Sequence, residues 1–320
     1  PNIEFNFVDD KRNSMDIVRR IIAEHPRRNA VRIIDQKHNQ GTGAARNAIV
    51  TYATGKYLFT MDCDDVIIPD CIEILYRKMV EHPVDFVAAS FVRKDVQGNI
   101  YPGGCQYDDV LVEEGDYAVA QYRYGQGKNI FVATWNKLYR TDFLRKNKIC
   151  CVPHYLIDDP WFTYQVIIRA RSCRLISDCT LFFTYNPLSV TSVKEQDGYT
   201  TFLGEQYLGT QRLKADYIYS LAEQPFYPGA LVDLLKMSLY HLYRVCASSK
   251  IAESEKEYFL QSFLEIRFLS PRHWNFMSKN TYKLLPLLTF YALPMMVKKG
   301  LVKSIVRVDL RSILHRWFHF

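Results

Sequence analysis

Three aspartates, Asp62, Asp64 and Asp65, follow an apolar run that ends at Met61. Carboxylate oxygens are the ligands that Mg²⁺ and Mn²⁺ prefer, and Mg²⁺ usually takes one or two of them together with phosphate oxygens. The Asp-x-Asp spacing therefore indicates a site where a divalent ion could also touch a diphosphate. A solvated acidic turn is the alternative, because so short a motif has little specificity.

The elements that would position these aspartates alternate between strand and helix over roughly the first 100 residues. The expected strands are 3–8, 31–34, 57–61 and 85–92, and the expected helices are 14–25, 41–55 and 69–82. Such alternation predicts an α/β fold whose mainly parallel sheet carries helices on both faces. Ligands bind at the carboxyl ends of strands in sheets of this kind. The acidic cluster at 62–65 and the pair Asp9-Asp10 both fall at such ends.

The pattern changes along the rest of the chain. Residues 100 to 195 are irregular, and from about 200 to 268 the apolar spacing becomes helical. Five leucines share one face of this helical stretch: Leu231, Leu234, Leu235, Leu239 and Leu242. We therefore predict two domains, residues 1–200 with the sheet and residues 201–320 as a helical region that ends in a basic tail.

Composition and charge exclude some classes of protein. The chain has 320 residues, of which 48% are hydrophobic, and a net charge of +7. From Ser270 onward nine Lys and Arg residues oppose one acid, Asp309, so the body of the chain is close to neutral. A nucleic-acid-binding protein more often carries its basic residues on the body. The eight cysteines are scattered, without the C-x-x-C spacing of a zinc site, and no secretory signal or long apolar run is present. We expect a cytoplasmic protein with reduced thiols.

The basic tail has the composition of a membrane-surface segment. Residues 284–297 are apolar but too short to cross a bilayer of about 30 Å. From Leu301 onward apolar residues recur at helical spacing with Lys303, Arg307, Arg311 and Arg316 between them. This pattern favours a helix on the anionic inner face of the plasma membrane. A helix folded back on the protein, with its cations in solvent, is the alternative.

Several short motifs occur in a defined order around the acidic cluster. They are Phe7-Val8-Asp9-Asp10, His38-Asn39-Gln40-Gly41, Ala44-Ala45-Arg46-Asn47, Ala53-Thr54-Gly55-Lys56-Tyr57, Asp62-Cys63-Asp64-Asp65, Trp135-Asn136-Lys137-Leu138-Tyr139 and Ile157-Asp158-Asp159, followed by Tyr185 and Ser192. In this order they resemble the inverting family 2 glycosyltransferases of GT-A fold, over roughly residues 1 to 195. Each motif is weak alone, whereas the ordered set is specific.

The resemblance implies a nucleotide-sugar site formed by Asp9, Asp10, Arg46, Asn47 and Asp62. Asp10 matches the family position that accepts a hydrogen bond from a uracil ring. Arg46 and Asn47 match residues near the base and the diphosphate, where a helix start and a cation favour anions. Asp62 would face the ribose and the metal.

The resemblance also implies a divalent metal, Mg²⁺ or Mn²⁺, with Asp64 as its main ligand and Asp62 as the second. Such an ion neutralises charge that develops on a nucleoside diphosphate as it leaves. Asp65 is expected only to orient the loop.

Inversion at the anomeric carbon needs a base that takes the proton of the acceptor hydroxyl. Asp159 matches the family's base, and Asp158, in place of the usual Glu, is the alternative. Asp158 could also simply cap the helix that follows, with Pro160 in its first turn.

The segment Trp135-Asn136-Lys137 matches the acceptor side of the family's site. Trp135 could stack on a sugar there, or equally pack under the sheet.

The resemblance implies transfer of a hexose or N-acetylhexosamine from a UDP-sugar to a growing surface glycan or a lipid-linked acceptor. A GDP- or dTDP-sugar is an alternative donor. The chain departs from the family at its start, because the first strand–helix unit, with its Pro-x-Tyr-Asn motif, is missing before Phe7-Val8-Asp9-Asp10. We expect a fragment, since loss of a central strand leaves unpaired backbone. A shortened, non-catalytic remnant that binds nucleotide or membrane is the alternative.

Overall fold

The structure is a computed structural model, and it describes residues 2–9, 15–62, 64–95, 97–155, 158–184, 199–265 and 285–307. The chain forms two compact units. We call them the α/β unit, Pro1–Ala120 with Asn129–Asn186, and the helical unit, Gln121–Lys128 with Pro187–Phe320. The division lies near residue 186, before the expected boundary at 200, and segment 121–128 groups with the helical unit.

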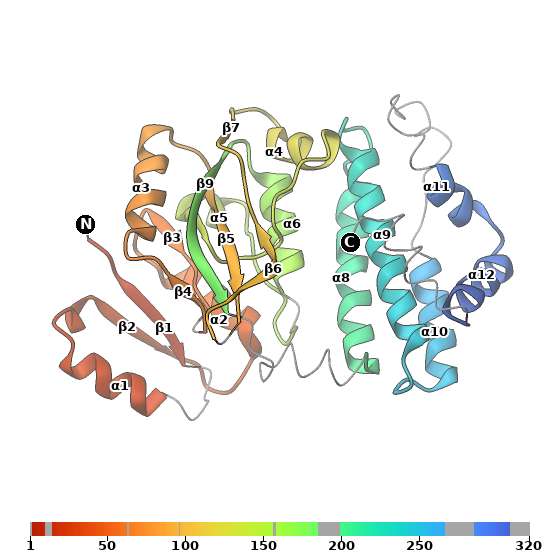
Figure 1. Ribbon diagram of the computed structural model, residues 1–320, viewed down its shortest axis with the longest axis horizontal. Coiled ribbons are helices and arrows are strands. Elements are labelled where there is room, and N and C mark those ends of the chain that lie inside the picture. The colour runs from red at the N-terminus through yellow and green to blue at the C-terminus, as the bar shows by residue number, and fades with distance from the viewer. Residues whose placement is uncertain are drawn as a thin grey trace. The chain divides into compact units, whose positions relative to one another are not determined.

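As far as β5 the α/β unit alternates strands and helices, except that β3 and β4 follow one another directly (Figure 1). Its helices are α1 (Met15–Glu24), η1 (Arg28–Ala30), α2 (Gly41–Tyr52), α3 (Cys71–Glu81), α4 (Ala118–Ala120), α5 (Thr141–Lys146) and α6 (Asp159–Arg169). Its strands are β1 (Phe5–Asp9), β2 (Val31–Asp35), β3 (Tyr57–Phe59), β4 (Val66–Ile67), β5 (Phe86–Lys94), β6 (Ile100–Cys105), β7 (Val110–Val112), β8 (Lys137–Arg140) and β9 (Cys173–Thr184).

Strands β1 and β2 form a separate two-stranded parallel sheet. Helix α1, which connects them, buries none of its described residues. Phe5 and Phe7 of β1 and Ile17 and Ile21 of α1 are among the exposed large apolar side chains. This small sheet therefore has little hydrophobic core of its own.

The other seven strands form one sheet with the central order β3-β8-β5-β9-β4. Strands β3 and β5 both pair antiparallel with β8, so they run in the same direction, and β9 pairs parallel with β5. Strands β4, β6 and β7 run antiparallel to their partners. The α/β class is confirmed, but the sheet is mixed rather than mainly parallel. Strand β8 comes from the irregular region after residue 100, where the strand–helix alternation no longer predicts strand direction.

Helices cover both faces of the seven-stranded sheet, as expected. On one face Leu75 and Met79 of α3 pack against Leu138 of β8 in a fully buried cluster. On the other face the ring of Phe162, from α6, lies edge-on to Tyr139 with the centroids 5.9 Å apart. Adjacent residues of a strand point to opposite faces, so Leu138 and Tyr139 connect β8 to both helical layers.

The helical region expected after residue 200 is present. It contains α8 (Thr201–Tyr219), α9 (Tyr227–Ala247), α10 (Glu253–Leu264), α11 (Leu285–Ala292) and α12 (Met295–Arg307), together with η2 (Gln121–Gly125). Four of the five leucines expected on one face of α9 are buried, and Leu239 is half-buried. The buried His241 of α9 lies with its Nδ1 atom 2.7 Å from the Tyr199 hydroxyl, and burial lowers the pKa of His241 well below its ordinary value.

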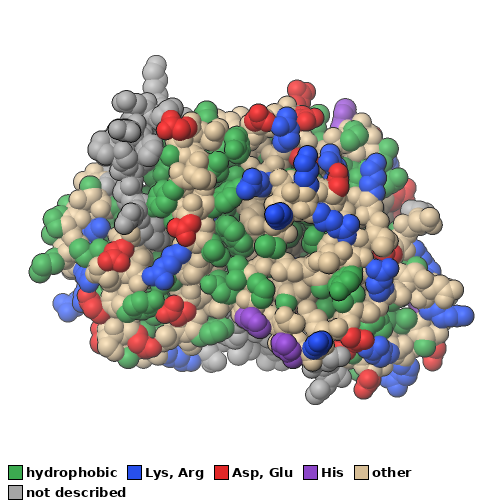
Figure 2. Space-filling model, turned by 180° about the vertical axis from the view of Figure 1, so that it is seen from behind, with side chains coloured by type: hydrophobic (Ala, Val, Ile, Leu, Met, Phe, Trp, Pro, Cys, Tyr) green, Lys and Arg blue, Asp and Glu red, His purple; other side chains and the backbone are tan. Residues whose placement is uncertain are grey.

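Within the described ranges, no helix has both the length and the apolar character needed to cross a membrane. On the face seen in Figure 2, Lys and Arg side chains are distributed among acidic and hydrophobic ones.

Candidate functional site

The first turns of α2 lie against the segment that precedes α6. Gly41 has a φ of +84°, in the left-handed region that favours glycine. A Cβ atom on Gly43 would come within 2.9 Å of the Val152 carbonyl oxygen, so the close approach requires glycine. Asn47 donates a 2.9 Å hydrogen bond from Nδ2 to the Cys151 carbonyl and accepts one of 2.8 Å from its N–H. These contacts fix the start of α2 against the residues leading to α6.

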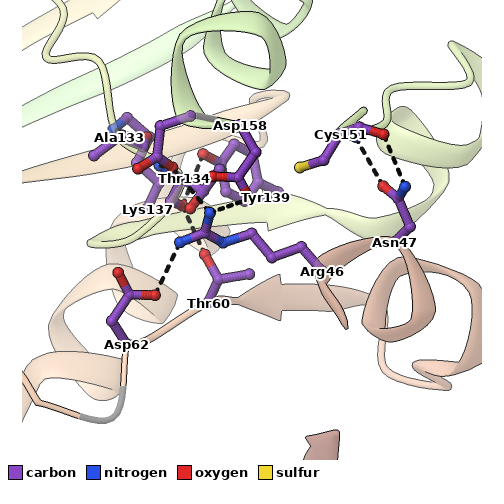
Figure 3. A network of polar contacts seen from close by, with 11 residues as sticks. Arg46, Asn47, Thr60, Asp62, Ala133, Thr134, Lys137, Tyr139, Cys151 and Asp158 are labelled. Carbon is purple, nitrogen blue, oxygen red and sulfur yellow. Dashed lines mark hydrogen bonds and ion pairs between the residues drawn. The ribbon is translucent and has the colours of Figure 1, made fainter. Parts of the chain in front are cut away.

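Arg46, also in α2, bridges three carboxylates from two segments of the chain. Figure 3 shows it between two of them, Asp62 and Asp158. Its guanidinium nitrogens lie 2.5 Å from Asp158 Oδ2, 2.9 Å from Asp62 Oδ1 and 3.5 Å from Asp159 Oδ1. The Arg46 side chain is 12% exposed, so water and salt screen these ion pairs only weakly. Four of the residues that the sequence proposed for the site therefore meet at one point.

The cluster has an excess of negative charge. Burial disfavours the charge of Arg46, but Asp159, Asp158 and Asp62 more than offset it and raise the Arg46 pKa above its ordinary value. Burial raises the pKa of Asp62 and of Asp158, Arg46 opposes this in both cases, and Asp159 adds repulsion. Three carboxylates share one guanidinium, so a further cation or a proton would reduce the remaining negative charge.

The two adjacent aspartates differ in accessibility. The side chain of Asp158 is 4% exposed and is held by Arg46, whereas that of Asp159 is 28% exposed. Asp158 stands at the N-cap of α6, yet its side chain makes no capping hydrogen bond. The capping alternative for the Asp158 side chain is therefore wrong, because Arg46 takes its carboxylate instead. Asp159 is the one that could meet a hydroxyl group from solvent or substrate.

The backbone of Thr134 holds Asp159 in place. Its N–H donates a 2.9 Å hydrogen bond to Asp159 Oδ1. Its carbonyl oxygen accepts hydrogen bonds from Thr60 Oγ1, at 2.7 Å, and from the Tyr139 hydroxyl, at 3.0 Å. The sequence analysis did not find Thr60 or Thr134, because a backbone donor leaves no signature in residue type. The adjacent Trp-Asn-Lys motif was the one available signal.

Lys137 supports the same turn from inside the protein. It is buried, and its Nζ donates a 2.7 Å hydrogen bond to the carbonyl oxygen of Ala133. Burial lowers the pKa of Lys137 to about 8, while the nearby Asp159 carboxylate and Cys105 favour its charged form. Lys137 is thus a buried cation behind the candidate base.

Asn136 is buried as well, in a left-handed conformation with a φ of +55°. Its Nδ2 donates to the carbonyl oxygens of Ala89 and Ser90, and its Oδ1 accepts from Thr180 Oγ1. Because its side-chain amide is fully engaged with the sheet, Asn136 orients the turn that follows Thr134.

Trp135, the first residue of that motif, is also buried. Its ring packs edge-on to Phe91, with centroids 4.8 Å apart, and stacks on Phe183 at 5.7 Å. The packing alternative for Trp135 is therefore the one observed. The sequence placed Trp135, Asn136 and Lys137 on the acceptor side, but the structure places all three in the interior, so their polar groups shape the site without lining an accessible surface.

The acidic turn between β3 and β4 contains one buried carboxylate, that of Asp65. Neither of its oxygens accepts a well-formed hydrogen bond from a described residue. Burial, together with repulsion from Asp64 and Asp62, raises its pKa to about 7, and the nearby Thr184 N–H opposes this only in part. A buried carboxylate in this state costs free energy unless a cation or a proton neutralises it.

These carboxylates fit a hard divalent cation by chemistry and by charge. Asp64 is exposed at the same turn, so its carboxylate is accessible to an ion. Among the described residues, no three His, Cys, Asp or Glu side chains are gathered closely enough to hold an ion unaided. Mg²⁺ typically takes only one or two protein carboxylates and completes its shell with water and phosphate oxygens. A metal at Asp62 and Asp64 remains a prediction, and Asp65 is a further, buried carboxylate at the same turn.

The raised pKa of Asp65 predicts a stability that depends on pH and metal. A carboxyl group with a folded-state pKa near 7 is stabilising while protonated, and that contribution is lost as pH rises from about 4 through 7. We expect the melting temperature of the metal-free Asp65→Asn variant to fall less between pH 5 and pH 8 than that of the unaltered protein. Scanning calorimetry at both pH values measures this, and equal losses would contradict it. Saturating Mn²⁺ should reduce the loss in the unaltered protein, because a nearby cation favours the ionised Asp65 carboxylate.

Other residues proposed from the sequence lie apart from the Arg46 cluster or outside the described residues. Asp9 is buried at the end of β1, where Arg19 lies 3.5 Å from its Oδ2 and 2.7 Å from Asp35 Oδ1. Asp10, Tyr185 and Ser192 lie outside the described ranges. The role of Asp9 and Asp10 in donor binding stays a prediction.

Comparison with known proteins finds relatives of the α/β unit. Residues 1–147 match the family described as Glycosyl transferase family 2. The glycosyltransferase GlyG of Streptococcus pneumoniae serotype 4 (strain ATCC BAA-334 / TIGR4) is 32% identical over 103 residues, which are 31% of this chain and 33% of GlyG. The glycosyltransferase EpsJ of Bacillus subtilis (strain 168) is 23% identical over 209 residues, 64% of this chain and 59% of EpsJ. The matches thus span less than two thirds of each of these relatives.

A solved structure shares the fold over nearly the whole chain. The structure of residues 1–349 of S. aureus TarS in complex with UDP-GlcNAc has a TM-score of 0.69 and 19% identity. The match covers 97% of this chain and 84% of that one. At this identity the likeness establishes the architecture, which agrees with the expected GT-A fold.

Proposed function

We propose, on the premise that residues 1–147 of this chain are a glycosyl transferase family 2 domain, that the protein transfers a sugar from a nucleotide-sugar donor to an acceptor hydroxyl group. The observation that carries the proposal is the Arg46 cluster. It brings the acidic turn of residues 62–65 next to Asp159, the accessible carboxylate at the start of α6. A donor-side acid and a base in one place are what displacement at an anomeric carbon requires.

We propose Asp159 as the base of an inverting reaction. Its side chain is accessible, the Thr134 N–H orients it, and an Arg46 nitrogen lies 3.5 Å from its Oδ1. Asp159 would take the proton of the acceptor hydroxyl as its oxygen attacks the anomeric carbon and the nucleoside diphosphate leaves. Asp158 is the weaker candidate, since it is buried and bound to Arg46.

The donor is proposed to be a UDP-sugar that carries a hexose or an N-acetylhexosamine. The support is the shared fold with TarS, which was solved with UDP-GlcNAc and with UDP. GDP- and dTDP-sugars are the alternatives. Asp64 and Asp62 would hold Mg²⁺ or Mn²⁺ against the diphosphate, where the ion supplies positive charge to the leaving group. Asp62 would then exchange part of its contact with Arg46 for the metal.

The acceptor is proposed to be a growing surface glycan or a lipid-linked sugar. A lipid-linked acceptor would place the protein at the cytoplasmic face of a membrane, and the cations of α12 agree with that location.

The decisive experiment measures UDP release from UDP-GlcNAc, UDP-glucose and UDP-galactose with Mn²⁺, with and without candidate acceptors. Release of UDP that stops on addition of EDTA supports the proposal. No release from any donor under any of these conditions would sink it for this polypeptide. NMR spectroscopy of the product then reports the anomeric configuration, and retention of the donor's configuration would contradict inversion.

The metal ligand has its own prediction. Asp64→Asn should abolish the Mn²⁺-dependent part of UDP-sugar binding, because it removes the accessible carboxylate of the acidic turn. Isothermal titration calorimetry with UDP, with and without Mn²⁺, measures the effect. Asp70→Asn, a nearby exposed aspartate outside the cluster, is the matched control. Binding that keeps its full Mn²⁺ dependence in Asp64→Asn would reassign the ligand, with Asp65 tested next.

One observation favours a non-catalytic protein of the same fold. The sheet of β1 and β2 stands apart from the seven-stranded sheet, and its apolar residues are exposed. A further strand that paired with an edge of this small sheet would cover part of its unpaired backbone. The same UDP-release assay, repeated on a longer polypeptide that supplies an apolar strand before residue 1, distinguishes an active transferase from a non-catalytic remnant. Activity in the longer polypeptide alone would show that the present chain is incomplete, and inactivity in both would favour a remnant.

A further inference from the structure

Helix α12 packs on the helical unit through an unusual side chain, the buried Lys298. The Lys298 Nζ donates to the carbonyl oxygens of Leu264 and Tyr291, at 3.4 and 3.3 Å. Leu264 ends α10 and Tyr291 lies in the last turn of α11, so the ammonium group sits where two helix dipoles concentrate negative charge. One turn further on, Val302 is buried on the same side. Lys298 and Val302 therefore mark the face of α12 that packs on the protein.

The opposite face of α12 carries apolar side chains in solvent. Met296 is 86% exposed, Val297 is 46% exposed and Leu301 is 42% exposed. At 100° per residue these three positions fall within about 140° of one another, with Gly300 and Ser304 between them. Single exposed apolar residues are ordinary. Here three apolar side chains are exposed on one face while a lysine of the same helix is buried. In water the opposite arrangement, with the charge exposed and the apolar side chains buried, is favoured.

The charges around this face are basic. The described part of α12 contains four cations and no acid. Lys299 and Lys303 share one carboxylate, that of Glu257, at 2.6 and 3.0 Å, and Arg307 is exposed. Exposed ion pairs of this kind contribute little, so Lys303 can exchange Glu257 for an external anion at small cost.

We propose that the exposed face of α12 docks on an anionic lipid bilayer. Met296, Val297 and Leu301 would enter the boundary between headgroups and acyl chains, while Lys303 and Arg307 reach the lipid phosphates. Apolar side chains flanked by cations are the combination that peripheral helices use at such surfaces. Docking of α12 on a membrane does not depend on the proposed function. Only its purpose rests on that function, since docking would hold the transferase where a lipid-linked acceptor lies.

This face differs from the one that the sequence pattern indicated. The repeat from Leu301 onward placed Val302, Ile305 and Val306 on the membrane side. In the structure Val302 is buried and Ile305 and Val306 are half-buried, so these residues follow the alternative of a helix folded back on the protein. The membrane side is the opposite face, which begins one turn earlier at Met296.

Co-sedimentation with phosphatidylglycerol–phosphatidylcholine vesicles tests the proposal, without donor or acceptor, so that its failure is separate from failure of the proposed function. The unaltered protein should bind the anionic vesicles and not pure phosphatidylcholine. Met296→Ser/Val297→Ser/Leu301→Ser should weaken binding at least about tenfold. Lys303→Gln/Arg307→Gln should weaken it by about fivefold for each cation that contacts the lipid, and added salt should have the same effect.

Ile17→Ser/Ile21→Ser is the matched control, because it removes exposed apolar side chains from α1 instead. It should bind vesicles as the unaltered protein does, and circular dichroism should show that all variants stay folded. Binding that survives the triple substitution, or an unaltered protein that does not bind anionic vesicles, overturns the proposal. So does a dimer that sedimentation detects and the triple substitution abolishes, since the face would then be occupied by a second copy.

Discussion

Asp159→Asn is expected to leave UDP-sugar binding nearly unchanged and to lower turnover by about 10³-fold, within the range usual for loss of a general base. Asn keeps the shape of Asp159 and can still accept the hydrogen bond from the Thr134 N–H, but it cannot take a proton. The donor-side acids, Asp62 and Asp64, are untouched. Comparison of donor affinity by calorimetry with turnover by UDP release measures the two effects separately.

The matched control is Asp158→Asn, its neighbour. This change removes a charge of the same kind next to Arg46, but from a side chain that is buried and cannot reach an acceptor. We expect a loss of stability and a smaller loss of turnover than in Asp159→Asn. If Asp159→Asn kept full activity and Asp158→Asn lost it, the base would be Asp158.

Arg46→Met is expected to lower the free energy of unfolding by about 3 kcal/mol and to abolish turnover. The substitution leaves the buried Asp158 carboxylate without its cation, and loss of one partner of a buried ion pair typically costs this much. It also removes the group that holds Asp62 and Asp159 together. Urea unfolding monitored by circular dichroism gives the stability, and UDP release gives the activity.

A double variant separates the two roles of Arg46. Arg46→Met/Asp158→Asn removes the uncompensated charge, so much of the lost stability should return, while activity should stay low because Asp62 and Asp159 are no longer bridged. Recovery of activity together with stability would mean that Arg46 acts only as a structural ion-pair partner. Stability equal to that of Arg46→Met alone would mean that Asp158 is not its principal partner.

Much of this site was predictable from the sequence because its chemistry depends on residue type. Asp62, Asp64 and Asp159 are candidates for a metal site or a base because carboxylates can bind cations and protons, and strand–helix alternation places the first two of them at a strand end. The order of the motifs pointed to one family, which the match over residues 1–147 then supported.

Other features depended on directions and distances that no local pattern encodes. The sequence contains Trp135-Asn136-Lys137 but not the fact that these side chains point inward, since that depends on the antiparallel insertion of β8. The backbone N–H that orients Asp159 is present in every residue, so only the fold could single out Thr134.

The acidic turn shows the same division. Sequence alone determined that three carboxylates lie within four residues, because that is a fact of covalent order. Only the tertiary structure decided that Asp62 faces Arg46, that Asp64 stays in solvent and that Asp65 is buried with a raised pKa. Burial and charge pairing arise between distant segments, such as Arg46 and Asp158, which are 112 residues apart. The free energy of each carboxylate is therefore set by neighbours that its own part of the chain does not contain.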